Sequence, residues 1–188
     1  MNNLRRPISA APVLCLTALL AFAPLASQAA LQVGATAPDF TAEAAVGGKV
    51  FQFSMAQARL QGPVVLYFYP KSFTSGCTVE AHEFSEATER LKALGATVIG
   101  MSNDDLDTQK RFSIEACRGK FPVAADAGAK VMKLYDASLM MLPNVADRIT
   151  YVVSPQGKVL LSFAKLSANG HVAAALKAVE QWNAEQRR

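Results

Sequence analysis

One segment constrains the fold of this chain more than any other: an apolar run that ends at a proline and is followed, after a short polar loop, by a cysteine. The run, Val64–Tyr69, is rich in β-branched and aromatic residues, which is typical of a buried central strand. Pro70 ends it, and Cys77 stands where a helical pattern begins. Unpaired backbone N–H groups and the positive end of the helix dipole favour thiolate over thiol at such a position. The segment therefore predicts a reactive cysteine close to the end of a central strand.

Residues 1–29 have the pattern of a secretory signal peptide. Arg5 and Arg6 give a positive start, Ile8–Leu25 is almost wholly apolar, and Ser27-Gln28-Ala29 supplies small residues for cleavage. An uncleaved membrane anchor is the alternative, but the apolar run is borderline in length for a membrane span. We expect cleavage, export to a bacterial periplasm, and no membrane attachment of the mature protein.

Residues 30–188 have the length of one ordinary domain. Without Arg5 and Arg6 the chain has 17 basic and 15 acidic residues, a net charge of +2. No basic cluster accompanies that small charge, so we expect no nucleic-acid partner. Cys15 lies in the segment to be removed, which leaves Cys77 and Cys117. Two cysteines in an exported protein are most often a structural disulfide, and this alternative must be weighed.

Strand and helix patterns alternate along residues 30–188. Gly47-Gly48 is a turn that predicts an N-terminal hairpin of Asp39–Ala45 and Lys49–Phe53. The further strands are expected at Val64–Tyr69, Ala96–Met101, Phe121–Ala125, Arg148–Ser154 and Lys158–Phe163. The helices are expected at Cys77–Leu94, from Asp104 or Asp105 to about Cys117, at Gly128–Tyr135 and from Ala168 to about Gln186. This order predicts an α/β, thioredoxin-like fold: a mixed central sheet flanked by helices, with the hairpin as an N-terminal extension. Sites in open α/β sheets form outside the carboxyl ends of the strands, which is where Cys77 follows its strand.

The residues around Cys77 resemble the active-site motif of the peroxiredoxins. Pro70-x-x-x-Thr74-x-x-Cys77 matches that motif, and Arg148 resembles the arginine that this family places beside its reactive thiol. The whole of residues 30–188 is similar to the peroxiredoxin Q (bacterioferritin comigratory) branch. Further segments carry that similarity: Gly34–Phe40, Tyr67–Lys71, Thr78-x-Glu80, and Phe121-Pro122-Val123 with Asp126.

The resemblance implies that the protein reduces hydrogen peroxide or organic hydroperoxides without a metal or an organic cofactor. Cys77 would attack the O–O bond and become a sulfenic acid. Arg148 would stabilise the thiolate and the leaving oxygen. The Thr74 hydroxyl would donate to the thiolate and accept from the peroxide, and Pro70 would shield the sulfur from water. The backbone N–H groups of Gly76 and Cys77 would polarise the peroxide.

The sequence departs from the branch at the position five residues after the reactive cysteine. Many relatives have a resolving cysteine there, and this chain has His82. Cys117, on the next helix, is the alternative resolving thiol, but it also fits a core residue or half of a static disulfide with Cys77. If Cys117 does not resolve, an external thiol must reduce the enzyme. Glu80 can pair with Arg148 or be a solvated helix charge.

Two other classes of function compete with a peroxidase. An exported thioredoxin-fold thiol–disulfide oxidoreductase is the first, but Cys77 lacks the second cysteine of a Cys-x-x-Cys motif. A non-catalytic redox or metal-binding protein that uses Cys77 and His82 is the second, but five residues on a helix place these side chains about 140° apart. The partners that we expect are a peroxide and a thioredoxin-like protein or small thiol as reductant, and the mature protein is expected to be a monomer.

Overall fold

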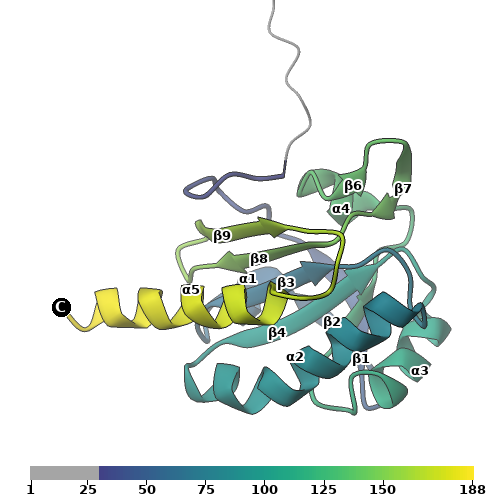
Figure 1. The fold of residues 1–188 in the computed structure, drawn as a ribbon, viewed down its shortest axis with the longest axis horizontal. Helices are drawn as coiled ribbons and strands as arrows, with labels where there is room; N and C mark the ends of the chain where they lie inside the picture. Colours follow the sequence, from purple (N-terminus) through teal and green to yellow (C-terminus); the bar gives the residue numbers. More distant parts are fainter. Residues whose placement is uncertain (1–29) are drawn as a thin grey trace, which may run out of the picture.

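The protein, seen in a computed structural model that describes residues 30–188, is built around a seven-stranded mixed sheet (Figure 1). In spatial order its strands are β2 (Lys49–Ser54), β1 (Thr41–Val46), β5 (Val123–Ala125), β4 (Thr97–Ser102), β3 (Val64–Phe68), β8 (Ile149–Val153) and β9 (Val159–Ala164). Strand β3 runs parallel to β4 and antiparallel to β8. The predicted α/β fold with a mixed sheet and an N-terminal hairpin is confirmed. The predicted signal peptide lies outside the described residues.

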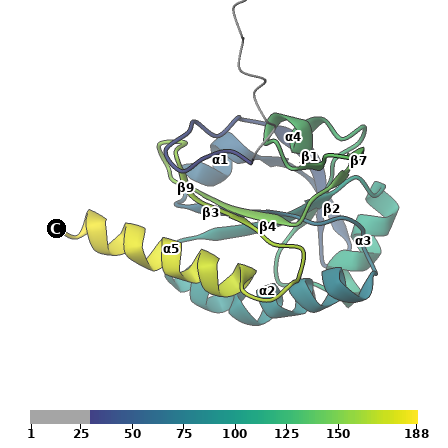
Figure 2. The same ribbon diagram turned by 45° about the horizontal axis from the view of Figure 1, so that its top comes forward.

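Helices cover both faces of the sheet (Figure 2). One face carries the two short helices, α1 (Met55–Arg59) and α4 (Lys130–Leu134). The other face carries the three long helices, α2 (Ser75–Ala93), α3 (Leu106–Glu115) and α5 (His171–Gln186). A separate small hairpin, β6 (Ser138–Leu139) and β7 (Leu142–Ala146), precedes β8. Within residues 30–188, no helix combines the length and apolar character that a membrane span requires.

Strand β3 separates two hydrophobic cores because its side chains alternate between the faces of the sheet. Val64, Leu66 and Phe68 pack toward α1 and α4. Val65, Tyr67 and, just beyond the strand, Tyr69 pack toward the three long helices. All six side chains are fully buried, which explains why the sequence shows an unbroken apolar run instead of an alternating one. The strand therefore contributes to both cores, and Tyr69, just beyond its end, still packs in the second one.

The helices differ from the sequence prediction in several places, and α4 and α5 begin two and three residues after their predicted starts. Helix α2 begins at Ser75, two residues before the predicted start, because Thr74 already has the extended backbone of an N-cap. Helix α1 was not predicted. It has only five residues, too few to give a hydrophobic period, and is stabilised by Ser54, whose hydroxyl accepts from Gln57 N at 3.3 Å.

Gly100 in β4 is a packing requirement of the central sheet. It pairs with Tyr67, and a Cβ at this position would lie 2.7 Å from the Tyr67 ring. That ring is fully buried and stacks on Phe84 with ring centroids 4.4 Å apart, so it has no room to move. We predict that Gly100→Ala lowers the free energy of unfolding by about 1–3 kcal/mol, as overpacking does.

Urea unfolding measures this loss. In a Tyr67→Leu background the same Gly100→Ala change should cost much less, because the ring that it clashes with is gone. Equal costs in both backgrounds would contradict the packing explanation.

Candidate active site

Cys77 lies in the first turn of α2, as the sequence predicts. The helix starts at Ser75, so Cys77 is its third residue, and the side chain is only 1% exposed. Backbone N–H groups in a first helical turn have no partner within the helix, and they lie next to the sulfur. The thiol is thus held in a buried position where the backbone favours negative charge.

Arg148 reaches Cys77 from the neighbouring strand. It directly precedes β8, and the alternation of that strand turns Arg148 and Thr150 toward α2 while Ile149 and Tyr151 enter the opposite core. The Arg148 Nη2 atom donates to Cys77 Sγ at 3.3 Å, and Nε donates to the Leu166 carbonyl at 2.9 Å. The side chain is nearly fully buried. The guanidinium is therefore directed at the sulfur by fixed contacts on both edges.

Glu80 pairs with the Arg148 guanidinium. It is three residues after Cys77, on the same face of α2, and its Oε2 accepts from Arg148 Nη1. The Glu80 side chain is fully buried, so the solvated charge that the sequence left open as an alternative is wrong. Burial raises the pKa of Glu80 to about 7, and the charge and hydrogen bond of Arg148 act in the opposite direction. Burial would lower the pKa of Arg148, but Glu80 and Cys77 together raise it, so the guanidinium stays charged.

Gly76 leaves the space that the guanidinium occupies. A Cβ on Gly76 would lie 3.2 Å from Arg148 Nη2. The sequence analysis gave Gly76 only a backbone role, and the structure adds this close approach. A side chain at this position would require Arg148 Nη2 to shift by a few tenths of an ångström, so the glycine favours the contact with the sulfur.

Thr74 and Pro70 lie in the loop that joins β3 to α2. Pro70 is half-buried, directly after the strand. The Thr74 hydroxyl is exposed and donates to the Lys71 carbonyl at 3.0 Å. The predicted donation from Thr74 to the thiolate is therefore wrong in this structure, because a hydroxyl has only one hydrogen and the loop carbonyl takes it. The hydroxyl oxygen still has lone pairs that can accept a hydrogen bond.

Buried polar contacts fix this loop against β4 and α3. Asp104 accepts from the backbone N–H of Ser72 at 2.7 Å and from the Ser102 hydroxyl at 2.8 Å. Tyr69 donates to Gln109 Oε1 at 2.7 Å, and Gln109 donates to Ser102 at 2.7 Å. Tyr69, Ser102 and Gln109 are fully buried. Since buried polar groups without partners are costly, the network holds the loop in one geometry.

Cys117 lies in the same core as Cys77. It follows the end of α3, is fully buried, and its backbone N–H donates to Phe112 O at 3.1 Å. Both cysteines of residues 30–188 are free thiols, so the static disulfide is wrong. Burial raises the pKa of Cys117 far above that of an ordinary thiol, which makes it the less reactive cysteine at rest. The structure thus places Cys117 in the core and does not decide whether it also reacts.

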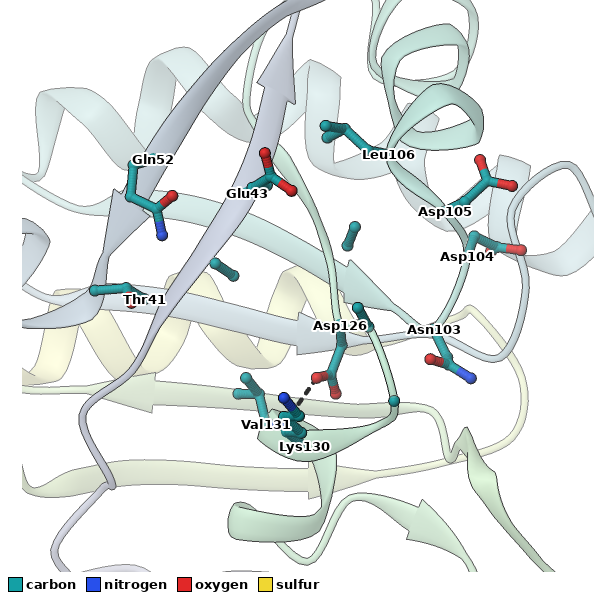
Figure 3. A pocket seen from close by; sticks show the side chains of 14 residues that line it. Thr41, Glu43, Gln52, Asn103, Asp104, Asp105, Leu106, Asp126, Lys130 and Val131 are labelled. Atoms are coloured by element: carbon teal, nitrogen blue, oxygen red, sulfur yellow. Dashed lines mark hydrogen bonds between the residues drawn. The ribbon is translucent and has the colours of Figure 1, made fainter.

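A separate cavity lies at the carboxyl ends of β4 and β5. It has a volume of about 550 Å³, and Figure 3 shows Glu43, Asp104, Asp105 and Asp126 around it. Its acidic groups already serve the fold: Asp126 accepts from Val131 N at 2.9 Å, drawn as a dashed line, and Asp105 caps α3. Among residues 30–188, no three His, Cys, Asp or Glu side chains are grouped to hold a metal ion. Reactive chemistry is concentrated at Cys77 instead.

Two residues of the site were missed by the sequence analysis. His171, the first residue of α5, is fully buried, with Nδ1 2.8 Å from Thr150 Oγ1 and 3.6 Å from Glu80 Oε1. The sequence analysis gave His171 no role. A signal was present for Thr150, because it is two residues after Arg148 on the same strand and must face the same side.

Comparison with known proteins agrees with this geometry. Residues 33–162 match the model of the AhpC/TSA family. The chain is 32% identical over 154 residues to a putative peroxiredoxin bcp of Helicobacter pylori (strain J99), a match that covers 79% of this chain and 98% of that protein. The chain belongs to the AhpC/TSA, or peroxiredoxin, family. The predicted resemblance to the family is thereby confirmed.

Two further relatives bear on the fold and on how much of a relative's length this chain covers. The crystal structure of peroxidoxin BcpB from Mycobacterium tuberculosis superposes with a TM-score of 0.71 at 27% identity, over 80% of this chain and 97% of that one. This match confirms the predicted thioredoxin-like architecture. The chloroplastic peroxiredoxin Q of Triticum aestivum is 36% identical over 126 residues, which are 67% of this chain but only 56% of that protein. The chain therefore spans little more than half the length of this relative.

Arg148 should control the fraction of Cys77 that is thiolate. We predict that Arg148→Met, which keeps the volume but removes the charge, slows alkylation of Cys77 by iodoacetamide at neutral pH by about tenfold. Peptide mass mapping measures the rate. Arg59→Met is the matched control. Arg59 is likewise an arginine paired with a carboxylate, Asp39 at 2.6 Å, but it lies on the opposite face of the sheet from Cys77. Equal rates in both variants would remove Arg148 from the site.

Proposed function

We propose that this protein is a thiol-dependent peroxidase that reduces hydrogen peroxide and organic hydroperoxides through Cys77. The observation that carries the proposal is the 3.3 Å contact between Arg148 Nη2 and Cys77 Sγ, made in the first turn of a helix. A positive charge and free backbone donors at a thiol are what a sulfur nucleophile needs. Membership in a family whose members are named peroxiredoxins supports the same chemistry.

The reaction follows from these contacts. The Cys77 thiolate attacks one oxygen of the peroxide, and the S–O bond forms as the O–O bond breaks. The bonding electron pair leaves with the second oxygen, which takes a proton and departs as water or an alcohol. Cys77 is oxidised to a sulfenic acid and the peroxide is reduced. Arg148 stabilises first the thiolate and then the charge that develops on the departing oxygen.

The loop orients the peroxide in this proposal. Thr74 gives its only hydrogen to Lys71, so its hydroxyl oxygen accepts a hydrogen bond from the peroxide. The N–H groups of Gly76 and Cys77 polarise the oxygen under attack. Pro70 limits the access of water to the sulfur. Thr74 therefore keeps the acceptor half of the role expected from the sequence.

Cys77→Ser should reduce hydrogen peroxide consumption to the uncatalysed rate, because a serine hydroxyl is not ionised at neutral pH. The measurement is peroxide loss with dithiothreitol as the reductant. Cys117→Ser is the matched control, since it removes a cysteine of the same core and leaves the first oxidation of Cys77 intact. Peroxide consumption that survives in Cys77→Ser would overturn the proposal that the protein reduces peroxides through Cys77.

We further propose that Cys117 resolves the sulfenic acid. Its sulfur would attack the Cys77 sulfur, form the S–S bond and release water, after which an external dithiol would reduce the disulfide. One thiol is buried in α2 and the other just after α3, so the start of α2 must open for them to meet.

Mass spectrometry after one equivalent of hydrogen peroxide tests this step. We predict a disulfide between Cys77 and Cys117 in the natural protein and an accumulating sulfenic acid on Cys77 in Cys117→Ser. A sulfenic acid that persists on Cys77 in the natural protein would instead mean a one-cysteine peroxidase that depends on an external thiol.

The setting of the reaction is also a proposal. The signal-like residues 1–29 support export to a periplasm. We propose that the exported protein works as a monomer. The reductant would then be a thioredoxin-like protein or a small thiol of that compartment. N-terminal sequencing of the protein from a periplasmic fraction, with light scattering, measures cleavage and oligomeric state together.

A further inference from the structure

Glu80 has one carboxylate oxygen that the proposed mechanism does not use. Its Oε2 accepts from Arg148, but its Oε1 has no hydrogen-bond partner among the described residues, although it is fully buried. A buried charged oxygen without a partner costs free energy, so the surroundings of Oε1 must supply some compensation. The structure places His171 Nδ1 3.6 Å from Oε1.

The contacts of His171 decide where its ring proton lies. Nε2 is 2.9 Å from the Lys165 carbonyl, which can only accept, so Nε2 carries a hydrogen. In a neutral ring Nδ1 is then unprotonated, and it accepts from the Thr150 hydroxyl at 2.8 Å. The ring is closed in further by Phe163, which packs edge-on with centroids 4.9 Å apart. An unprotonated Nδ1 therefore faces an unpaired carboxylate oxygen inside the core.

One proton resolves this conflict. On Glu80 Oε1 it removes the unpaired charge, and on His171 Nδ1 it places a positive charge 3.6 Å from that oxygen while the Thr150 hydroxyl becomes the acceptor. We propose that Glu80 and His171 hold one proton between them behind Arg148, and that this pair sets how much of the Arg148 charge is available to the Cys77 sulfur. His171 is thus a positioning residue: it acts on the sulfur only through Glu80 and Arg148. The inference rests on the proposed function of Cys77 as the reactive thiol.

The sign of the effect follows from the charges. With the proton, the pair is neutral overall and Arg148 is free to stabilise a thiolate. Without the proton, Glu80 is a full carboxylate that neutralises Arg148, and a thiolate is less favoured. Burial raises the pKa of Glu80 and lowers the pKa of His171, directions that allow exchange of the proton near neutral pH. The other titratable groups that act on the pair are Cys77 and Glu83 on α2, Arg148 before β8, Lys165 before α5 and Tyr67 on β3.

Two substitutions should move the reactivity of Cys77 in opposite directions. His171→Asn offers Glu80 an amide N–H that stabilises the charged carboxylate, so Glu80 keeps its charge to lower pH and alkylation of Cys77 near neutral pH slows by about threefold to tenfold. Glu80→Gln imitates the protonated acid, so Arg148 keeps its full effect, and alkylation speeds up by a similar factor above the pH at which the natural pair loses its proton. The natural protein should show a second inflection in its alkylation rate between about pH 5 and about pH 8, and both variants should lose it.

The measurement is the rate of Cys77 alkylation by iodoacetamide as a function of pH, read by peptide mass mapping. Thr150→Val is the matched control, because it removes a buried contact to the same ring but keeps the exchangeable proton, so the second inflection should remain. If the two residues had a purely structural role, Glu80→Gln and His171→Asn would change the alkylation rate in the same direction. That result would overturn the inference. Should His171→Asn not fold, NMR shifts of the Glu80 carboxyl carbon and the His171 ring nitrogens in the natural protein test it directly: shifts that do not change over the same pH range overturn it.

Alkylation reports the ionisation of Cys77 whether or not peroxide is reduced. Opposite shifts in a protein without peroxidase activity would keep the inference and refute the proposed function. An active peroxidase whose alkylation profile is the same in the natural protein and both variants would refute the inference and keep the function.

Discussion

The site depends on one buried positive charge, the guanidinium of Arg148. A charge without partners in a protein core is very costly, so its position is determined by the groups that satisfy it. Here these are the Cys77 sulfur, a Glu80 oxygen and the Leu166 carbonyl, which come from α2 and from the segment before α5. Helix α2, strand β8 and helix α5 therefore meet around Arg148. The fold and the reactivity of the thiol have the same physical cause.

A second set of buried polar contacts ties the reactive loop to the helix that precedes Cys117. Tyr69 and Ser72 on the loop side share Gln109 and Asp104 with α3 and β4. Next to them, Phe73 packs edge-on against Phe112 with ring centroids 5.2 Å apart and has a φ of 65°, unusual for a residue other than glycine. The segment before Cys77 is thus over-determined while folded. Opening the start of α2 must break several contacts at once, which would separate attack on peroxide from disulfide formation.

Much of the fold could be predicted because its signals are local. The apolar run Val64–Tyr69, the turn Gly47-Gly48 and the amphipathic C-terminal segment each specify an element without knowledge of the rest. The predicted start of the helix at Cys77 was two residues too late, because the extended backbone already ends at Thr74. The direction of the Thr74 hydrogen could not be predicted, because it depends on which carbonyl the folded loop brings within reach.

The amino-acid sequence was enough to predict the kind of site. The cysteine at a helix start after a central strand follows from periodicity and helix geometry, which act between near neighbours in the chain, and the resemblance to the peroxiredoxins pointed to Arg148. Only the tertiary structure decided that Glu80 is buried, that Gly76 makes room for Arg148, and that His171 faces Glu80 across the core. The physical reason is that desolvation and charge pairing depend on contacts between distant segments: Glu80 lies 68 residues from Arg148 in the chain and in direct contact with it in the fold.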